Sequence, residues 1–158
     1  MIVLQVPTPA AIALSPLSFS FSYLLALSIR IGIAFVLTIG IGAERAHDAH
    51  SAGLRTFPLV AVASCAYILL TIAVFGPASD AGSRMLAGLV TAVGFVGGGA
   101  IIKDEQRVRG TATAAGIWTT SAIGAASGYG QFEIAVIVAI ITYLTLRILR
   151  RFEPSVQE

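Results

Sequence analysis

Long uncharged stretches separate a few clusters of charged residues in this chain, and this pattern limits what the chain can fold into. Only 11% of the 158 residues are charged and 56% are hydrophobic, whereas about 25% of the residues of a soluble domain are charged. A chain with so little charge cannot cover a soluble surface. The uncharged stretches are instead long enough for helices that cross a membrane. The composition therefore predicts an integral membrane protein.

Five stretches are candidates for spanning helices, each of which needs about 20 mostly apolar residues. They cover residues 19–42, 58–75, 84–102, 111–127 and 132–149. The predicted fold class is therefore all-α, a bundle of five transmembrane helices within residues 19–151. Residues 1–18 are expected to form a flexible or interfacial tail, and residues 152–158 a cytoplasmic tail.

The basic residues indicate how the bundle is oriented, because cytoplasmic loops of membrane proteins carry an excess of lysine and arginine. With five spans, most of the basic residues fall on one side: Arg45, Arg55, Lys103, Arg107, Arg109, Arg147, Arg150 and Arg151. The opposite side carries only Arg84. We therefore expect the N-terminus outside and the C-terminus in the cytoplasm. Since the basic residues flank apolar spans, the net charge of +2 does not imply a nucleic-acid partner.

The third span ends in a glycine-rich run, Gly94-Phe95-Val96-Gly97-Gly98-Gly99-Ala100-Ile101-Ile102. A soluble protein uses such a run to bind phosphate, but Lys103 is misplaced for a Walker loop and no GxGxxG is present in a strand-to-helix context. A membrane protein uses it to bring helix backbones together. Gly94 and Gly98 fit a GxxxG spacing, as do Gly124 and Gly128. The third and fourth helices are therefore expected to pack on each other.

Small and hydroxyl residues form a stripe on the fourth helix. The stripe consists of Thr113, Gly116, Thr120, Gly124 and Ser127, at spacings of three and four. Such a stripe lets helices approach closely and hydrogen-bond across their interface. A polar lining for ions is the alternative interpretation of the same residues.

Arg30 within the first span and Glu44 just after it are candidates for function. Arg30 lies roughly 10 Å inside the outer boundary of the membrane, where an arginine is costly unless it snorkels or pairs. A structural pairing, with Glu133 or Asp80 as partner, and a charge on an ion path are the two interpretations. Arg30, Leu37 and Glu44 recur at a spacing of seven residues, so they share one helix face.

The sequence offers little for catalysis or metal binding. No Ser/His/Asp triad or nucleophile elbow is recognisable, and histidine occurs only at His47 and His50. These two imidazoles and Asp48 could bind a transition metal, but a solvated loop is the simpler interpretation, and magnesium prefers oxygen ligands. We therefore predict no enzyme activity, no cofactor and no metal site.

Four short blocks together indicate a family. The first is Ile39-Gly40-Ile41-Gly42-Ala43-Glu44-Arg45, and the second is Ala52-Gly53-Leu54-Arg55-Thr56. The third is the glycine run, and the fourth is Val108-Arg109-Gly110-Thr111-Ala112-Thr113-Ala114-Ala115, followed by Trp118. In order and spacing these blocks resemble the MgtC/SapB family of bacterial inner-membrane proteins. Ala92 and Thr111-Ala112 depart mildly from the family pattern.

The resemblance implies a multi-pass protein of the bacterial inner membrane, linked to magnesium limitation, acid stress or intracellular survival. The residues that match family motifs or are candidates for helix contacts are Arg30, Glu44, Arg45, Gly53, Arg55, Thr56, Gly94, Gly97, Gly98, Gly99, Arg109, Gly110, Thr113 and Trp118. Some members carry an ACT-like domain after the fifth helix, and this chain is expected to be a short member without it.

Two functions compete at this point, beside the plainer interpretation of a small structural or assembly membrane protein. The first is a regulatory protein that contacts another membrane complex, and the resemblance names the F-type ATP synthase as one candidate. The second is an oligomeric ion channel or transporter that uses Arg30, Glu44 and the hydroxyl stripe of the fourth helix. A dry, tightly packed centre would favour regulation, and a water-accessible cavity would favour transport. The expected partners are the lipid bilayer and either another membrane protein or further copies of this chain.

Overall fold

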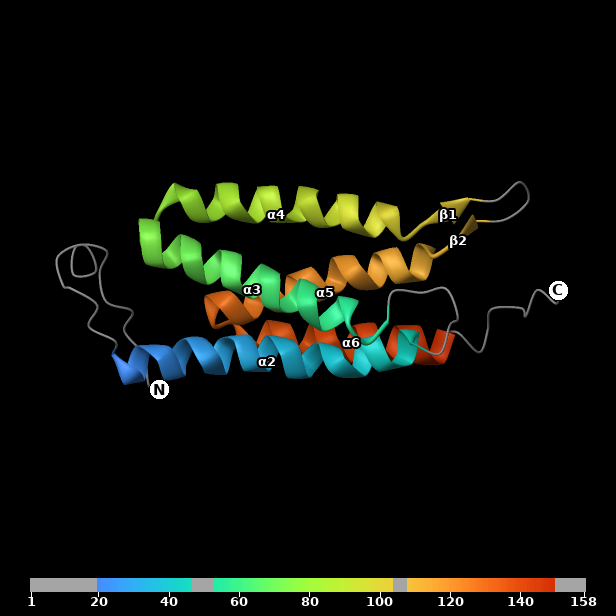
Figure 1. Ribbon diagram of the computed structural model, residues 1–158, viewed down its shortest axis with the longest axis horizontal. Helices are drawn as coiled ribbons and strands as arrows, with labels where there is room; N and C mark the ends of the chain where they lie inside the picture. The colour runs from blue at the N-terminus through green and yellow to red at the C-terminus, as the bar shows by residue number, and fades with distance from the viewer. Residues whose placement is uncertain (1–19, 47–52, 104–107, 150–158) are drawn as a thin grey trace.

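The computed structural model describes residues 20–46, 53–103 and 108–149. The two predicted tails and the loop with His47, Asp48 and His50 lie outside these residues. Within them the chain forms long helices and one short β-hairpin: α2 (Phe21–Arg45), α3 (Thr56–Phe75), α4 (Asp80–Gly99), β1 (Ile102–Lys103), β2 (Val108–Arg109), α5 (Thr111–Tyr129) and α6 (Phe132–Leu149). The five helices lie roughly along one common axis (Figure 1).

Large apolar side chains cover the outside of the bundle. Phe95 is 85% exposed and Phe21 is 79% exposed, and they are joined by exposed leucine, isoleucine and valine on every helix except α5. Within the described residues, α2, α3, α4 and α6 are long and apolar enough to cross a membrane. Helices with an apolar outer surface are stable in lipid rather than in water. The prediction of an all-α membrane bundle is confirmed.

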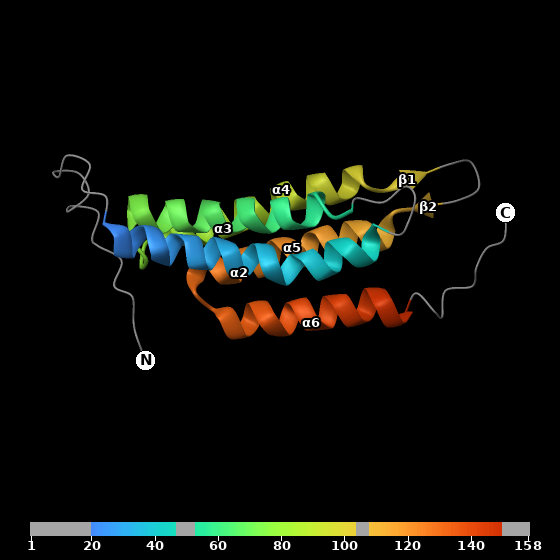
Figure 2. The same cartoon turned by 60° about the horizontal axis from the view of Figure 1, so that its bottom comes forward.

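Helix α5 differs from the other four because they enclose it. It packs against α2, α3, α4 and α6, most extensively against α3. Figure 2 shows α4 and α6 on opposite edges of the bundle with α5 between them. The glycine, serine and threonine of α5 lower its hydropathy, and it is not among the helices that qualify as spans on length and composition in the described part of the chain. The predicted fourth span, residues 111–127, therefore exists as a helix that is sheltered by its neighbours.

Local signals explain where the helices end. Gly130 has a φ of 76° and closes α5. The Gln131 N–H donates to the Ala126 carbonyl at 2.9 Å and the Gly130 N–H donates to the Ser127 carbonyl at 3.0 Å, which is a Schellman motif. Helix α6 starts at Phe132, so α5 and α6 form a tight antiparallel hairpin.

Helix α4 begins and ends earlier than the predicted span. It begins at Asp80 rather than Arg84, with Ser79 as its N-cap residue, because an acidic side chain in the first turn is favourable at a helix N-terminus. It ends at Gly99 after three consecutive glycines, which are weak helix formers. Ile102 therefore lies in β1, opposite Arg109 of β2, rather than in the third span.

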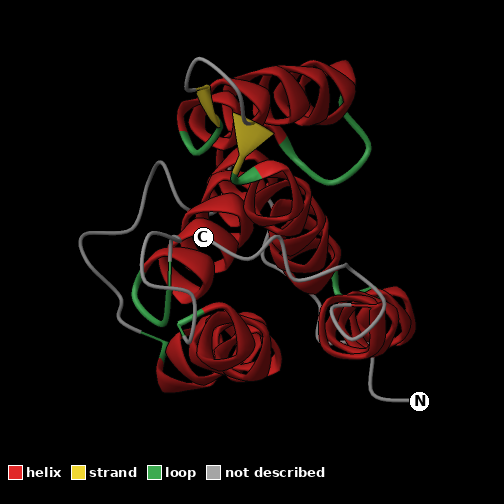
Figure 3. Ribbon diagram, turned by 90° about the vertical axis from the view of Figure 1, so that its right-hand side faces the viewer, coloured by secondary structure: helices red, strands yellow, loops and turns green. Residues whose placement is uncertain are grey.

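The two ends of the bundle differ in charge. The end at the right of Figure 1, which carries the hairpin, is called the basic end, and Figure 3 views the bundle from this end. Its described charged residues are five cations and one anion: Arg45, Arg55, Lys103, Arg109, Arg147 and Glu44. The opposite end, called the Arg30 end, has two of each sign: Arg30, Arg84, Asp80 and Glu133.

Candidate functional site

The small face of α5 packs against α3 at van der Waals limits. A Cβ atom placed on Gly124 would lie 2.2 Å from the Ala61 carbonyl oxygen. A Cβ on Gly128 would lie 2.8 Å from Cβ of Ile68, and one on Gly116 would lie 2.9 Å from the Phe57 ring. At Gly124 the obstructing atoms belong to the backbone of α3, whereas at Gly116 and Gly128 they include side-chain atoms of α3. The stripe predicted on the fourth helix is therefore a packing seam, and α3 rather than α4 is its partner.

Hydroxyl groups along this seam are bonded within the protein, with one exception. Ser64 Oγ of α3 donates to Ser121 Oγ of α5 at 3.0 Å, and Ser127 Oγ donates to the Ile123 carbonyl at 2.9 Å. Thr120 is fully buried, and its Oγ1 has no hydrogen-bond partner among the described residues. The centre of the bundle therefore holds one unsatisfied polar atom in an otherwise bonded interface.

Arg30 binds the C-terminal end of α5. Its Nη1 donates to the Gly128 carbonyl oxygen at 2.8 Å, and a Cβ on Gly130 would lie 3.4 Å from its Nη2. A cation is favourable at the C-terminus of a helix, where the last carbonyls have no partner within the helix. The hydrogen bond shown for Arg30 is thus to a backbone carbonyl, where the sequence had suggested Glu133 or Asp80. This contact ties α2 to the turn between α5 and α6.

A second arginine ties α2 to the other end of α5. Nη2 of Arg45 donates to Oγ1 of Thr113 in the first turn of α5 at 2.9 Å. Between the two arginines, α2 presents a buried face to the bundle that includes Ala34, Thr38 and Ile41. Helix α2 therefore lies antiparallel to α5 and is fastened to it near both ends.

The first two family blocks meet where α2 ends and α3 begins. A Cβ on Gly42 would lie 3.2 Å from Cα of Leu54, and a Cβ on Gly53 would lie 3.3 Å from Cα of Ala46. The Thr56 N–H donates to the Gly53 carbonyl at 3.0 Å, and Arg55 is exposed as the N-cap residue of α3. These two blocks form one close backbone crossing at the basic end.

The remaining charges of the basic end come from α2 and α6. Arg147 of α6 donates to the Tyr143 hydroxyl, and its guanidinium carbon lies 5.6 Å from the centre of the Tyr143 ring. Glu44 interacts electrostatically with Arg147. Arg30 and Glu44 therefore lie on α2 with different neighbours, Arg30 at the turn after α5 and Glu44 beside α6.

The glycine run of α4 is divided between a buried and an exposed side. A Cβ on Gly97 would lie 3.2 Å from the Ala114 carbonyl oxygen of α5. By contrast, a Cβ on Gly94, Gly98 or Gly99 would meet no atom within 4 Å. Helices α4 and α5 do pack on each other, as predicted, but the contact uses Gly97 rather than the GxxxG pair Gly94 and Gly98. That pair lies exposed on the outside of the bundle.

The third and fourth family blocks join through Gly110. This residue is the N-cap of α5, with a φ of 86°, and a Cβ on it would lie 2.0 Å from the Ala100 carbonyl oxygen. Lys103 and Arg109, on the two paired strands, are both exposed. The turn from α4 into α5 thus depends on a glycine, and it projects two cations from the basic end.

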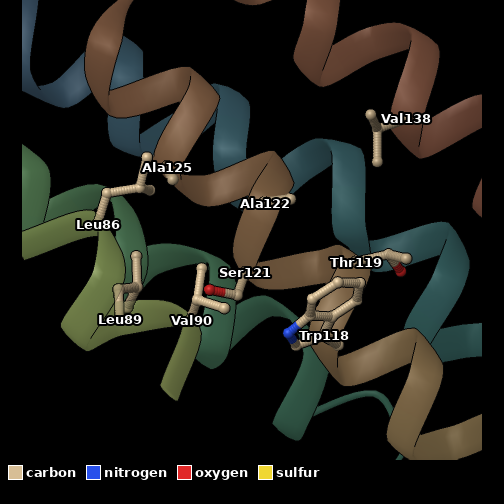
Figure 4. Close-up of a pocket in the computed structure, with 9 residues that line it drawn as sticks. All are labelled: Leu86, Leu89, Val90, Trp118, Thr119, Ser121, Ala122, Ala125 and Val138. Atoms are coloured by element: carbon tan, nitrogen blue, oxygen red, sulfur yellow. The ribbon is translucent and has the colours of Figure 1, made fainter. Parts of the chain in front are cut away.

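A groove lies between α4, α5 and α6, with a volume of about 240 Å³. Figure 4 shows its lining, in which the α4 side chains face those of α5 and Val138 comes from α6. The nine lining residues are Leu86, Leu89, Val90, Trp118, Thr119, Ser121, Ala122, Ala125 and Val138. Trp118 is 55% exposed beside this groove. The groove is therefore mainly apolar and faces the outside of the bundle.

Chemistry beyond binding has little support in these contacts. Among the described residues, no group of three or more His, Cys, Asp or Glu side chains could hold a metal ion. The arrangement can hold helices together and present surfaces to lipid or to another protein. Sequence reasoning missed the α3 face that receives α5. Its signal was present in Ala61, Ser64 and Cys65, which are small residues at spacings of three and one.

Comparisons with known proteins agree with this architecture. The model of the MgtC family matches residues 31–155. The chain is 36% identical to SrpB of Synechococcus elongatus in an alignment of 125 residues that covers 72% of this chain and 69% of SrpB. It is 37% identical to MgtC of Salmonella typhimurium over 118 residues, which are 75% of this chain and 50% of MgtC.

A third relative is YhiD of Escherichia coli K12, which is provisionally named a magnesium transporter. It is 35% identical to the chain in an alignment of 114 residues that covers 68% of this chain and 53% of YhiD. The chain thus spans about half the length of MgtC and YhiD. No solved structure matches it. Because the family model covers most of the chain and the helices form the expected membrane bundle, the chain belongs to the MgtC family.

Proposed function

We propose that this chain is a regulatory protein of the bacterial inner membrane that acts by helix-to-helix contact with another membrane complex. The basic end would lie in the cytoplasm, in keeping with the excess of lysine and arginine there. The family resemblance connects this role with magnesium limitation or acid stress, and the relative YhiD is provisionally named a magnesium transporter. The F-type ATP synthase is the candidate complex, and a second copy of the chain is the other candidate partner.

The exposed glycine face of α4 carries this proposal. Ala87, Thr91, Gly94 and Gly98 recur at spacings of four, three and four, and all four are exposed. The Thr91 hydroxyl is already bonded to the Ala87 carbonyl at 3.0 Å, so the face offers small side chains without free polar atoms. Small residues on a membrane helix allow the backbone of a second helix to approach closely. Each glycine weakens α4 by about 1 kcal/mol, which a partner helix would offset.

The packing of α5 also supports a function by contact with another protein rather than by ion conduction. The approaches at Gly124 and Gly128 leave no room for water between α5 and α3. Arg30 and Arg45 are engaged by Gly128 and Thr113 at the two ends of α5. A packed centre of this kind was the feature expected of a regulatory protein.

Leucine at Gly94 or Gly98 should weaken association with the partner complex by about tenfold or more, because the side chain would hold the partner helix away. The measurement is co-purification with the F-type ATP synthase in mild detergent, together with ATP-driven acidification of inverted membrane vesicles. Wild-type protein should co-purify and lower the acidification, and both variants should lose both effects.

Gly88→Leu is the matched control. Gly88 is also a glycine of α4 at which an added Cβ would meet no atom within 4 Å, and it lies on a different face of the helix from Gly94 and Gly98. This variant should behave like wild type. Equal loss in all three variants, or no effect of the wild-type protein on acidification, would contradict the proposed contact with the ATP synthase.

Ion transport is the second candidate function, and the unsatisfied hydroxyl of Thr120 favours it. A buried polar atom without a partner is rare, and this one lies on α5 midway between Thr113 and Ser127. If an oligomer uses this line as a path, purified protein in liposomes should conduct an ion, and Thr120→Val or Arg30→Ala should lower that flux. A flux equal to that of protein-free liposomes would remove this candidate.

A further inference from the structure

The groove between α4, α5 and α6 requires an apolar occupant. Its two polar side chains are already bonded inside the protein. Ser121 accepts a hydrogen bond from Ser64, and Thr119 Oγ1 donates to the Gly116 carbonyl at 3.0 Å. The other lining residues are aliphatic, except for the Trp118 ring. Because the lining is mostly aliphatic, the groove suits a hydrocarbon chain better than an ion or a polar ligand.

The outer face of α5 connects this groove with the basic end. Thr111, Ala115, Trp118 and Ala122 are exposed and recur at spacings of four, three and four, so they share one face. Trp118 lies seven residues after Thr111, the first residue of α5, which corresponds to about 10 Å along the helix, and Arg109 lies two residues before Thr111. One leaflet of a bilayer is about 15 Å of hydrocarbon, half of a core of about 30 Å. An acyl chain that starts at the level of Arg109 would therefore end beside Trp118.

The charges at the start of this face suit an anionic headgroup. Lys103 and Arg109 are exposed on the two strands of the hairpin, directly before α5. They alternate with Ile102 and Val108, which are 54% and 57% exposed. Exposed apolar and basic side chains together are typical of segments that lie in the membrane interface. Among the residues that the structure describes, the Arg30 end has balanced charges and no comparable pair of exposed cations.

We propose that this surface binds an anionic phospholipid of the phosphatidylglycerol type. The headgroup phosphate contacts Lys103 and Arg109, and one acyl chain follows α5 past Ala115 to Trp118 at the groove. Each basic residue near an anionic surface favours binding by roughly fivefold, which is about 1 kcal/mol. This lipid site is independent of the protein contact proposed for α4.

The chain provides its own probe, because Trp118 is its only tryptophan. Full-length protein is placed in phosphatidylcholine nanodiscs with a low fraction of lipid whose acyl chains carry bromine, which quenches tryptophan on contact. We expect brominated phosphatidylglycerol to quench Trp118 at least about fivefold more effectively than brominated phosphatidylcholine at the same fraction. The double variant Lys103→Gln/Arg109→Gln should reduce this ratio to about one.

Two controls separate the site from general lipid contact. Arg84→Gln, which removes a cation from the Arg30 end, should keep the full ratio. In the unmodified protein, raising the salt from about 0.05 to about 0.5 M should lower the ratio, because it screens the exposed charges. Equal quenching by the two lipids would overturn the proposal, as would a preference that survives in the double variant. Protection of Trp118 from both lipids would overturn it too, in favour of a protein helix in the groove.

Discussion

Replacing Gly124 with alanine should lower the free energy of unfolding by about 3 kcal/mol, the upper part of the range for overpacked cores. The new Cβ would lie 2.2 Å from the Ala61 carbonyl oxygen and 2.9 Å from Cα of Ala61. Both are backbone atoms of a helix, which cannot turn aside as a flexible side chain can. Helices α3 and α5 would have to separate, and the hydrogen bond between Ser64 and Ser121 would lengthen.

The measurement is an unfolding titration with sodium dodecyl sulfate in mixed micelles, followed by circular dichroism. Gly94→Ala makes the same chemical change on an exposed helix, where no atom lies within 4 Å of the new Cβ. It should leave the protein as stable as wild type or stabilise it by up to about 1 kcal/mol. A Gly124→Ala protein that unfolds at the wild-type detergent fraction would show that α3 and α5 do not meet as described.

Replacing Gly110 with alanine should detach the β-hairpin from the bundle. The residue has a φ of 86°, a conformation that costs a residue with a side chain about 1–2 kcal/mol. Its Cβ would also lie 2.0 Å from the Ala100 carbonyl oxygen, a backbone atom after α4. Strain and overlap together should raise the opening equilibrium of the hairpin by at least about tenfold.

Amide hydrogen exchange at the four paired residues Ile102, Lys103, Val108 and Arg109 measures this opening, because the backbone hydrogen bonds between the two strands lie among them. The core amides of α3 should exchange as in the wild type, since α3 does not depend on the hairpin. Gly99→Ala is the control nearest to the turn, with no atom within 4 Å of its Cβ. Unchanged exchange in Gly110→Ala, or equal acceleration in both variants, would refute the proposed role of Gly110.

The sequence predicted which segments form helices better than it predicted which helices pack against each other. Hydropathy located the apolar helices because burial in lipid depends on composition along a single helix. GxxxG spacing marked both the pair Gly94 and Gly98 and the pair Gly124 and Gly128, although only the second pair is buried against another helix. Spacing defines a face of a helix, whereas the partner of that face depends on the lateral order of the bundle. The sequence of a single helix does not specify that order.

Arg30 shows a second limit of sequence reasoning. The sequence indicated how deep Arg30 lies in the span and that its charge needs a partner. Its acceptor is the backbone carbonyl of Gly128, 98 residues away in the chain. Every residue has a backbone carbonyl, so no residue type in the sequence marks this acceptor. The sequence therefore suggested carboxylates such as Glu133 instead. The end of a helix becomes visible as a cation site only once the helices are assembled.

The enclosed position of α5 has a consequence for how the protein enters the membrane. Helices α2, α3, α4 and α6 are apolar enough to partition from the translocon into lipid individually. Helix α5 carries the hydroxyl and glycine residues of the seam and lacks that ability by composition. Its insertion should therefore wait until α3 is in place to receive it, with α6 following as the second arm of a helical hairpin. The glycine and threonine residues of the seam would then make biogenesis an ordered process, in which the neighbouring helices insert before the central helix.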